Sequence, residues 1–160
     1  MKMKHQLFVF GLILCMTSFS AVVPVSTLTL QLKPGWNLVT LTRPLESLQG
    51  NVNKFLLLKP LSFDMNSSAY VFCNQAEDLK PGVGYWIFSG KSQMVELALD
   101  TKQTAAQPTL TKGWNLVGMT DGASWPNAAV AIWGWKDGRF VQVNKTELQV
   151  GCAYWAFFNA

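Results

Sequence analysis

Short runs of alternating apolar and polar residues, separated by turn-forming residues, extend along most of the chain. In STLTLQL (26–32), Leu28, Leu30 and Leu32 alternate with threonines and a glutamine, which is the pattern of a half-buried strand. In GWNLVTLT (35–42), apolar residues fall on both faces, as in a strand that is covered on both sides. This period of two residues predicts an all-β fold.

Two hairpins are predicted farther along the chain. SFDM-NSS-AYVF (62–72) and IWGW-KDG-RFVQV (132–143) each contain two short strand-like runs around a polar turn, and Asp137-Gly138 is a strong hairpin signal. Further strands are predicted from aromatic or alternating runs at 84–88, 92–100 and 153–157. Residues 44–58 contain at most a short helix.

One motif unit occurs twice, as three sequence blocks in the same order. The matched blocks are KPGWNLVTLT (33–42) with TKGWNLVGMT (111–120), LSFDMNSSAYV (61–71) with AIWGWKDGRFV (131–141), and LKPGVGYWIF (79–88) with LQVGCAYWAF (148–157). Self-similarity of this kind indicates an internal repeat. We therefore expect a first β repeat with flanking strands at 21–102 and a second at 103–160. The two are expected to interlock in one barrel- or sandwich-like domain.

Four tryptophans recur at matched positions of the two copies. The pairs are Trp36 with Trp114 and Trp86 with Trp155. We assign these indoles to the core or to packing between the copies, because large rings supply much of the buried area of small β domains. Trp36 and Trp114 in particular are expected to occupy equivalent, largely buried places.

The two copies differ at their ends. The strand predicted at 92–100 follows the first copy, whereas the second copy ends with the chain shortly after 153–158. An uncovered aromatic edge there would invite aggregation. We therefore expect 26–32 to pair beside 153–158 and close the structure.

The matched blocks resemble a repeat of exported bacterial proteins, in which GWN-L-(I/V)-x-L opens a unit and L-x-PG-x-GYW closes it. The opening is matched at 35–41 and 113–119, and the closing is matched fully at 79–86. In the second closing block, Val150 and Ala153 stand where the pattern has proline and glycine. The resemblance implies a β-rich extracellular or cell-envelope module, and it brings no catalytic residue with it.

Residues 1–20 have the layout of a secretory signal peptide. MKMKHQ is positively charged, an apolar stretch follows at 7–16, and small residues precede Ala21. Leu14 is too bulky for the position before a lipidated Cys15. We expect 1–20 to be removed and the protein to be exported to the periplasm, the cell surface or the medium, with no membrane span remaining.

The net charge and the distribution of charged residues do not indicate a particular partner. Residues 21–160 contain eleven Lys plus Arg, since Lys2 and Lys4 fall in the signal, against nine Asp plus Glu, which leaves +2. The basic residues are scattered singly, whereas nucleic-acid binders cluster them on one face. No nucleic-acid partner is therefore expected.

The chain offers little catalytic chemistry after export. His5 is the only histidine and lies in the signal, which excludes Ser–His and Cys–His catalysis and makes a zinc site improbable. No phosphate loop or dinucleotide fingerprint occurs, so we expect no cofactor. Four carboxylates lie near aromatic residues, but their turn and strand-end positions favour structural roles: Asp64, Asp121, Asp137 and Glu147.

Trp125, Trp133 and Trp135 have no tryptophan counterpart in the first copy, and they are the candidate ligand contacts. The sequence WGW places Trp133 and Trp135 on one strand face. Exposed, these indoles would form a platform for a sugar ring or an apolar partner surface, whereas buried indoles would only enlarge the core. Both interpretations remain open from the sequence.

Cys73 and Cys152 are the only cysteines outside the signal. An oxidising compartment favours a disulfide between them. Their apolar strand contexts favour free buried thiols instead.

The function expected from these observations is that of a non-catalytic exported module. It would bind a glycan or a cell-envelope protein, or have a structural role at the envelope, and would use no catalytic, cofactor or metal site. The alternative is a small glycan-active hydrolase that uses a pair of carboxylates.

Intact-mass analysis of the exported protein should give a chain that begins near Ala21, because the charged, apolar and small-residue segments of 1–20 end there. A retained Met1 or an acylated Cys15 would contradict this prediction.

Overall fold

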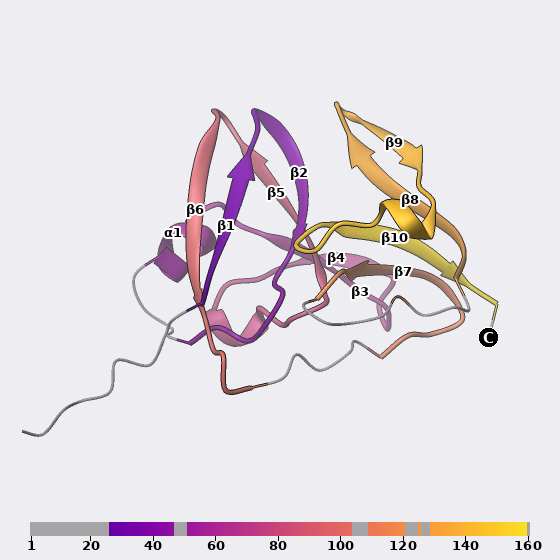
Figure 1. Ribbon diagram of the computed structural model, residues 1–160, viewed down its shortest axis with the longest axis horizontal. Coiled ribbons are helices and arrows are strands. Elements are labelled where there is room, and N and C mark those ends of the chain that lie inside the picture. The colour runs from indigo at the N-terminus through magenta and orange to yellow at the C-terminus, as the bar shows by residue number, and fades with distance from the viewer. Residues whose placement is uncertain (1–25, 47–50, 104–108, 121–124, 126–128, 160) are drawn as a thin grey trace, which may run out of the picture.

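The computed structural model describes residues 26–46, 51–103, 109–120, 125 and 129–159 (Figure 1). The described part is mostly β-strand with one short α-helix, which confirms the predicted all-β fold and the short helix within 44–58. In chain order the helix and strands are β1 (Ser26–Leu32), β2 (Gly35–Thr40), α1 (Asn51–Leu57), β3 (Leu61–Asp64), β4 (Ala69–Phe72), β5 (Gly84–Ser89), β6 (Gln93–Leu99), β7 (Gly113–Gly118), β8 (Ala129–Lys136), β9 (Arg139–Gln142) and β10 (Ala153–Phe158).

Two four-stranded antiparallel sheets have the same arrangement of strands. The first has the order β2-β5-β3-β4, and the second has the order β7-β10-β8-β9. Matched sequence blocks lie on matched strands, so that β2 corresponds to β7, β5 to β10, and the β3–β4 hairpin to the β8–β9 hairpin. No described sheet closes into a barrel, and the arrangement is sandwich-like.

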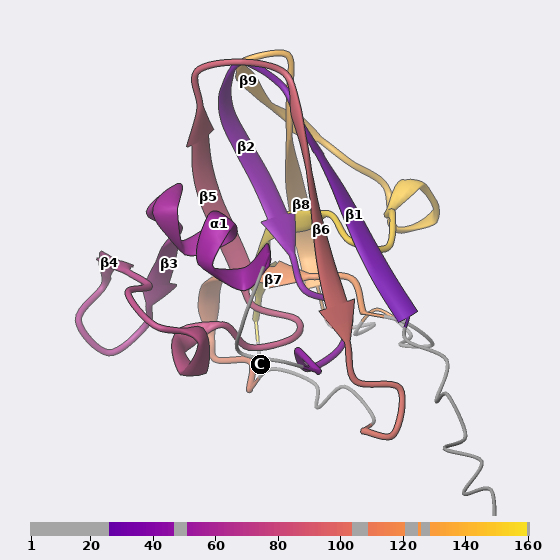
Figure 2. The same cartoon turned by 90° about the vertical axis from the view of Figure 1, so that its left-hand side faces the viewer.

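The N-terminal strand pairs within the first half of the chain. β1 is antiparallel to β6, with Ser26 opposite Leu99 and Leu32 opposite Gln93. The prediction that 26–32 pairs beside 153–158 is therefore wrong. Short turns join β1 to β2 and β5 to β6. The β1–β6 ribbon therefore folds back over β2 and β5, which pair with each other (Figure 2).

Each sheet has its own apolar cluster, and a third cluster joins the sheets. The ribbon and α1 enclose a core that includes Leu30, Leu32, Val52, Phe55, Tyr85, Ile87, Val95 and Leu97. The second sheet packs a smaller core of Val117, Ala129, Ile132, Tyr154, Ala156 and Phe158. The cluster that joins the sheets consists of Leu38, Trp86, Leu116 and Ala153, with further aromatic rings against it.

The asparagine of each GWN block closes the turn before its strand. Asn37 accepts a hydrogen bond from the Lys33 N–H (2.9 Å) and donates to the Lys33 and Gly35 carbonyls (2.9 and 3.0 Å). Asn115 makes the matching bonds to Thr111 and Gly113. Gly35 and Gly113 have φ of 96° and 99°, which only glycine adopts readily.

The tyrosine of each closing block also anchors a turn. The Tyr85 hydroxyl accepts a hydrogen bond from the Lys80 N–H, and the Tyr154 hydroxyl accepts one from the Gln149 N–H at 2.9 Å. Burial raises the pKa of both phenols, that of Tyr154 to about 12. The folded protein therefore favours the neutral, protonated form of both phenols.

The two sheets meet where β2 and β7 end. The Thr40 N–H donates to the Gly151 carbonyl (3.1 Å), and the Gly118 N–H donates to the Gly82 carbonyl (2.8 Å). Thr40 and Gly118 are matched positions, as are Gly82 and Gly151, so these two bonds are reciprocal. The isolated bridges between Val39 and Cys152 and between Val83 and Val117 have the same reciprocity.

This meeting point has room for a side chain from only one copy. A Cβ atom at Gly118 would overlap the Thr40 side chain. The Thr40 hydroxyl is in turn held by a 2.8 Å hydrogen bond to the Val83 carbonyl. A Cβ atom at Gly84 would lie 2.7 Å from Cγ of Leu116. The absence of a side chain at Gly84 therefore leaves room for Leu116 of the opposite sheet.

Gly118→Ala should lower the free energy of unfolding by about 1–3 kcal/mol, because the added methyl group overpacks a site with little room to relax. Combining it with Thr40→Gly should recover part of that loss in a double-mutant cycle measured by urea unfolding. Gly90→Ala is the control, since nothing lies within 4 Å of the added atom. Strict additivity of the two substitutions would contradict the prediction.

Candidate binding surface between the two sheets

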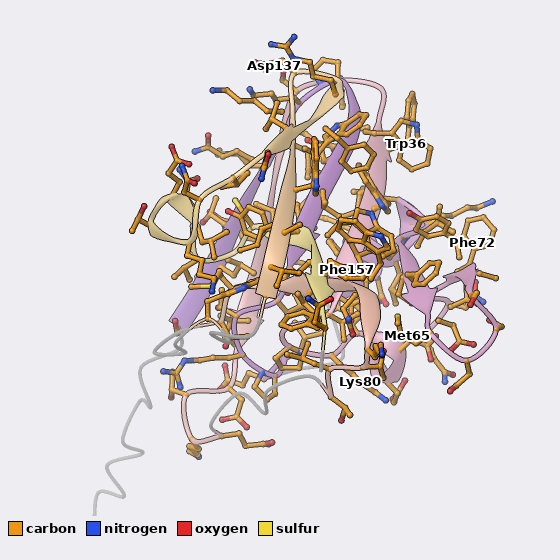
Figure 3. All side chains as sticks on the ribbon, turned by 90° about the vertical axis from the view of Figure 1, so that its right-hand side faces the viewer. Trp36, Met65, Phe72, Lys80, Asp137 and Phe157 are labelled. Carbon is orange, nitrogen blue, oxygen red and sulfur yellow. The ribbon has the colours of Figure 1, made fainter. Side chains whose placement is uncertain are left out.

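Aromatic side chains cover the faces that the two four-stranded sheets turn toward each other. On β2 and β5 the cross-strand pairs are Trp36 with Phe88 and Leu38 with Trp86. On β7 and β10 the matching pair of rings is Trp114 with Phe157. Alternation along each strand places these residues on one face. Figure 3 shows rings from both sheets gathered between Trp36 and Phe157.

Two apolar pockets open on this surface. Pocket A, of about 330 Å³, is lined by Trp36, Leu61, Tyr70, Trp86, Trp135 and Phe140. Pocket B, of about 550 Å³, is lined by Phe63, Trp114, Trp133, Phe140 and Trp155. Phe140 borders both, so the pockets are neighbours.

The two pockets follow one plan. In pocket A, Trp36 and Trp86 of the first sheet are joined by rings from the β8–β9 hairpin. In pocket B, the matched Trp114 and Trp155 of the second sheet are joined by Phe63 from the β3–β4 hairpin. Each pocket therefore combines the two motif tryptophans of one copy with a hairpin ring of the other.

Edge-to-face contacts between rings of opposite sheets fix the pocket walls. The ring centroids of Trp86 and Trp135 are 5.0 Å apart at 86°, and those of Phe63 and Trp155 are 4.9 Å apart at 72°. Such pairs stabilise by about 0.5–1.5 kcal/mol beyond the area that they bury. The walls are thus held in place without a ligand.

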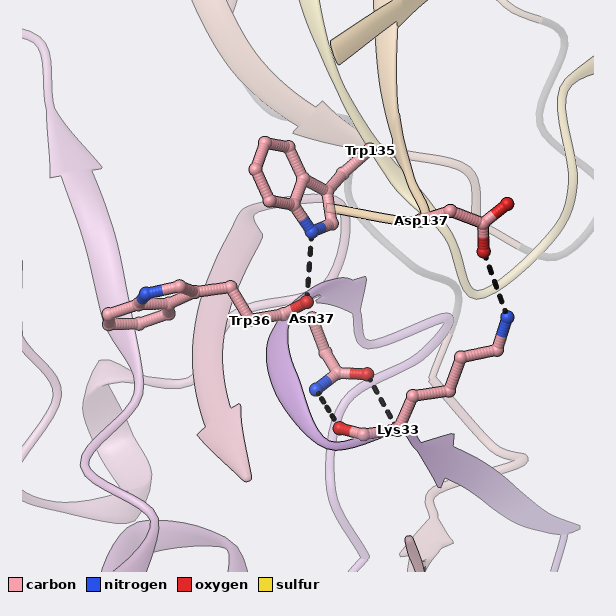
Figure 4. A network of polar contacts seen from close by, with 5 residues as sticks. All are labelled: Lys33, Trp36, Asn37, Trp135 and Asp137. Carbon is pink, nitrogen blue, oxygen red and sulfur yellow. Dashed lines mark hydrogen bonds and ion pairs between the residues drawn. The ribbon is translucent and has the colours of Figure 1, made fainter. Parts of the chain in front are cut away.

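A polar contact also ties β8 to β2. The Trp135 Nε1–H donates to the Trp36 carbonyl at 2.9 Å (Figure 4). Nearby, the exposed Lys33 ammonium and Asp137 carboxylate lie 3.6 Å apart. An exposed pair of this kind contributes little stability, so the indole hydrogen bond is the more important link.

The predicted burial of Trp36 and Trp114 is wrong. Their exposed fractions are 46% and 43%. Both lie on their strands away from Thr40 and Gly118, where the sheets come closest, so the opposite sheet does not cover them. The expected equivalence of place does hold, since Trp36 packs on Phe88 and Trp114 packs on Phe157.

The structure separates the three candidate tryptophans. Trp133 lines pocket B and Trp135 lines pocket A, so the WGW sequence contributes one ring to each pocket. Trp125 lies elsewhere. It packs on Tyr154 (5.9 Å between centroids), against the core of the second sheet.

Several lining residues were not singled out from the sequence as ligand contacts, above all Trp36, Trp114 and Phe140. The matched sequence blocks contain a signal that could have identified them. Tyr70 and Phe140 are matched positions, and both are exposed rings of edge strands that line a pocket.

The carboxylates considered for catalysis have local structural roles where they are described. Asp64 accepts hydrogen bonds from the Ser67 hydroxyl and the Asn66 N–H, which lower its pKa. Glu147 accepts a hydrogen bond from the Asn144 N–H. Asp121 lies outside the described residues. Neither pocket is lined by a carboxylate among the described residues.

Cys73 and Cys152 are free thiols in this structure, in place of the disulfide that the sequence left open. Cys73 is buried in the core beneath the ribbon, whereas Cys152 packs against the core of the second sheet. Burial raises the pKa of both thiols, which disfavours the reactive thiolate.

The described residues contain no group of three or more potential metal ligands and no helix long and apolar enough to cross a membrane. Comparison of the chain with protein-family models, with curated proteins and with solved structures found no match.

Trp135→Phe should lower the free energy of unfolding by about 1 kcal/mol more than Trp133→Phe, because only the first removes the hydrogen bond to the Trp36 carbonyl. Trp133→Phe makes the same change of ring size two residues earlier on the same face. Equal losses in chemical denaturation would show that the bond adds no stability.

Proposed function

We propose that this chain is a non-catalytic exported module that binds a partner protein through pockets A and B. The observation that carries the proposal is a pair of neighbouring pockets whose described lining is almost wholly aromatic. Soluble proteins rarely expose continuous apolar surface of this kind without a binding role. Tryptophan and tyrosine are also the side chains most enriched at interaction hot spots.

The chemistry of the lining favours an apolar ligand over a sugar. A glycan stacks on aromatic rings, but its hydroxyl groups also need hydrogen-bond partners, since an unpaired polar group costs free energy on burial. The Tyr70 hydroxyl is the one side-chain hydrogen-bond acceptor among the residues that line the pockets. The other polar groups of the lining are indole N–H donors, and that of Trp135 already donates to the Trp36 carbonyl. Apolar side chains have no such requirement.

The form of the surface favours an extended segment that contains proline. Aromatic-lined grooves bind proline-rich segments, whose polyproline conformation is already ordered before binding. Pockets A and B share Phe140, so one extended segment can place an apolar group in each. The edge-to-face pairs hold the rings in position, which limits the entropy lost on binding.

The proposal includes export and a partner outside the cytoplasm. The layout of residues 1–20 and the resemblance of the matched blocks to repeats of exported bacterial proteins support a partner at the cell envelope or in the medium.

The test is selection from a displayed library of random dodecapeptides, followed by titration of the enriched peptide monitored by tryptophan fluorescence. Enriched sequences should contain proline and bulky apolar residues. Trp36→Ala and Trp114→Ala should each weaken binding by about 2 kcal/mol, roughly thirtyfold, because each removes an exposed wall of one pocket.

Met94→Ala is the matched control, since Met94 is an exposed apolar residue of β6 that lines neither pocket. It should leave the affinity unchanged. Cellohexaose and chitohexaose are titrated in parallel. The peptide proposal would be replaced by a glycan-binding one under two conditions. No peptide is enriched, and either sugar binds in a way that Trp36→Ala and Trp114→Ala abolish.

A further inference from the structure

The outer edge of β4 is uncovered and apolar. Among the described strands only β3 pairs with β4, and all four β4 residues are exposed. Tyr70 and Phe72 are 48% and 57% exposed, and Phe72 projects from the side of the molecule in Figure 3. Natural proteins usually protect such an edge with charged residues, proline or a bulge.

The register shows which backbone groups face outward. The Cys73 N–H donates to the Pro60 carbonyl at 2.8 Å, which makes this a hydrogen-bonded pair. Hydrogen-bonded pairs alternate in an antiparallel ladder, so Ser62 with Val71 is the next one. The N–H and C=O groups of Tyr70 and Phe72 therefore point away from β3. The Phe72 carbonyl accepts a long hydrogen bond of 3.5 Å from the Asn74 side-chain amide, which a paired strand would replace.

These outward groups are complementary to those of an identical strand. A twofold axis through Val71 places Tyr70 opposite Phe72 of a second copy, and Phe72 opposite its Tyr70. Both pairs then fall in hydrogen-bonded positions, and each brings two aromatic rings together on one face. We propose that the partner of this edge is a second copy of the chain, joined β4 to β4 in a continuous eight-stranded sheet.

The sequence around β4 permits like-with-like pairing. Residues 65–76 contain no charged side chain, so two copies meet without repulsion. The matched edge strand β9 differs, since Lys136, Asp137 and Arg139 lie at or beside it. A twofold axis through Val141 would place Phe140 opposite Gln142 and give no aromatic pair. The structure thus protects one edge and leaves the other open to a copy of itself.

The dimer does not require peptide binding, although Tyr70 both flanks the twofold axis and lines pocket A. Its interface is the rim of the sheet, and Phe72 and Val71 line neither pocket.

Sedimentation velocity over a range of concentrations tests the proposal on the purified protein. The unaltered chain should dimerise. Val71→Lys and Val71→Glu should each raise the dimer dissociation constant about tenfold or more, because the axis brings two like charges directly opposite each other. An equimolar mixture of the two variants should restore the dimer, since opposite charges then meet.

Val141→Lys, at the matched position of β9, is the control and should leave the dimer intact. Circular dichroism checks that each variant folds, and Phe72→Lys blocks the same edge by a second route if Val71 proves intolerant. A monomer at all concentrations, a dimer that Val71→Lys and Phe72→Lys leave unchanged, or a mixture that fails to associate would overturn the proposal. Dodecapeptide binding retained by Val71→Lys would separate this result from the proposed function.

Discussion

The close approach of Thr40 and Gly118 is the constraint on which the arrangement of the two sheets depends. Two backbones can exchange reciprocal hydrogen bonds there only because one of the facing positions has no side chain. Once the strands meet at this point, the alternation along β2 and β7 directs the tryptophans of both GWN blocks toward the space between the sheets. The pockets are a consequence of that geometry.

The same geometry explains why the aromatic surface is both ordered and partly open. Near the meeting point, Leu38, Trp86, Leu116 and Ala153 are buried and pack together. Farther along the strands, cross-strand partners such as Phe88 support rings that the opposite sheet does not cover. The buried end of the aromatic surface thus holds in position the rings at its other end, which face solvent.

Much of the fold follows from local sequence. Alternation and turn residues predicted the strands, and the matched blocks predicted corresponding places for Trp36 and Trp114. Exposure of these indoles could not be predicted, because alternation gives the face on which a ring lies and not how far a second sheet extends over it. The pairing of β1 was also missed, since its leucine pattern fits any half-buried neighbour and only the turns beside β2 and β5 select β6. Of the candidate site, the sequence identified Trp133 and Trp135, whereas Phe140 joined it only through tertiary packing.

The unequal pair of Thr40 and Gly118 also makes the two halves of the chain unable to substitute for each other. Two first halves brought together would set threonine against threonine in a space that admits one side chain. Two second halves would set glycine against glycine and leave a void in its place. The chain thereby distinguishes its own complementary half from a duplicate of either half, a form of specificity built against misassembly. A protein assembled from several such units would need the same alternation of large and small at every junction.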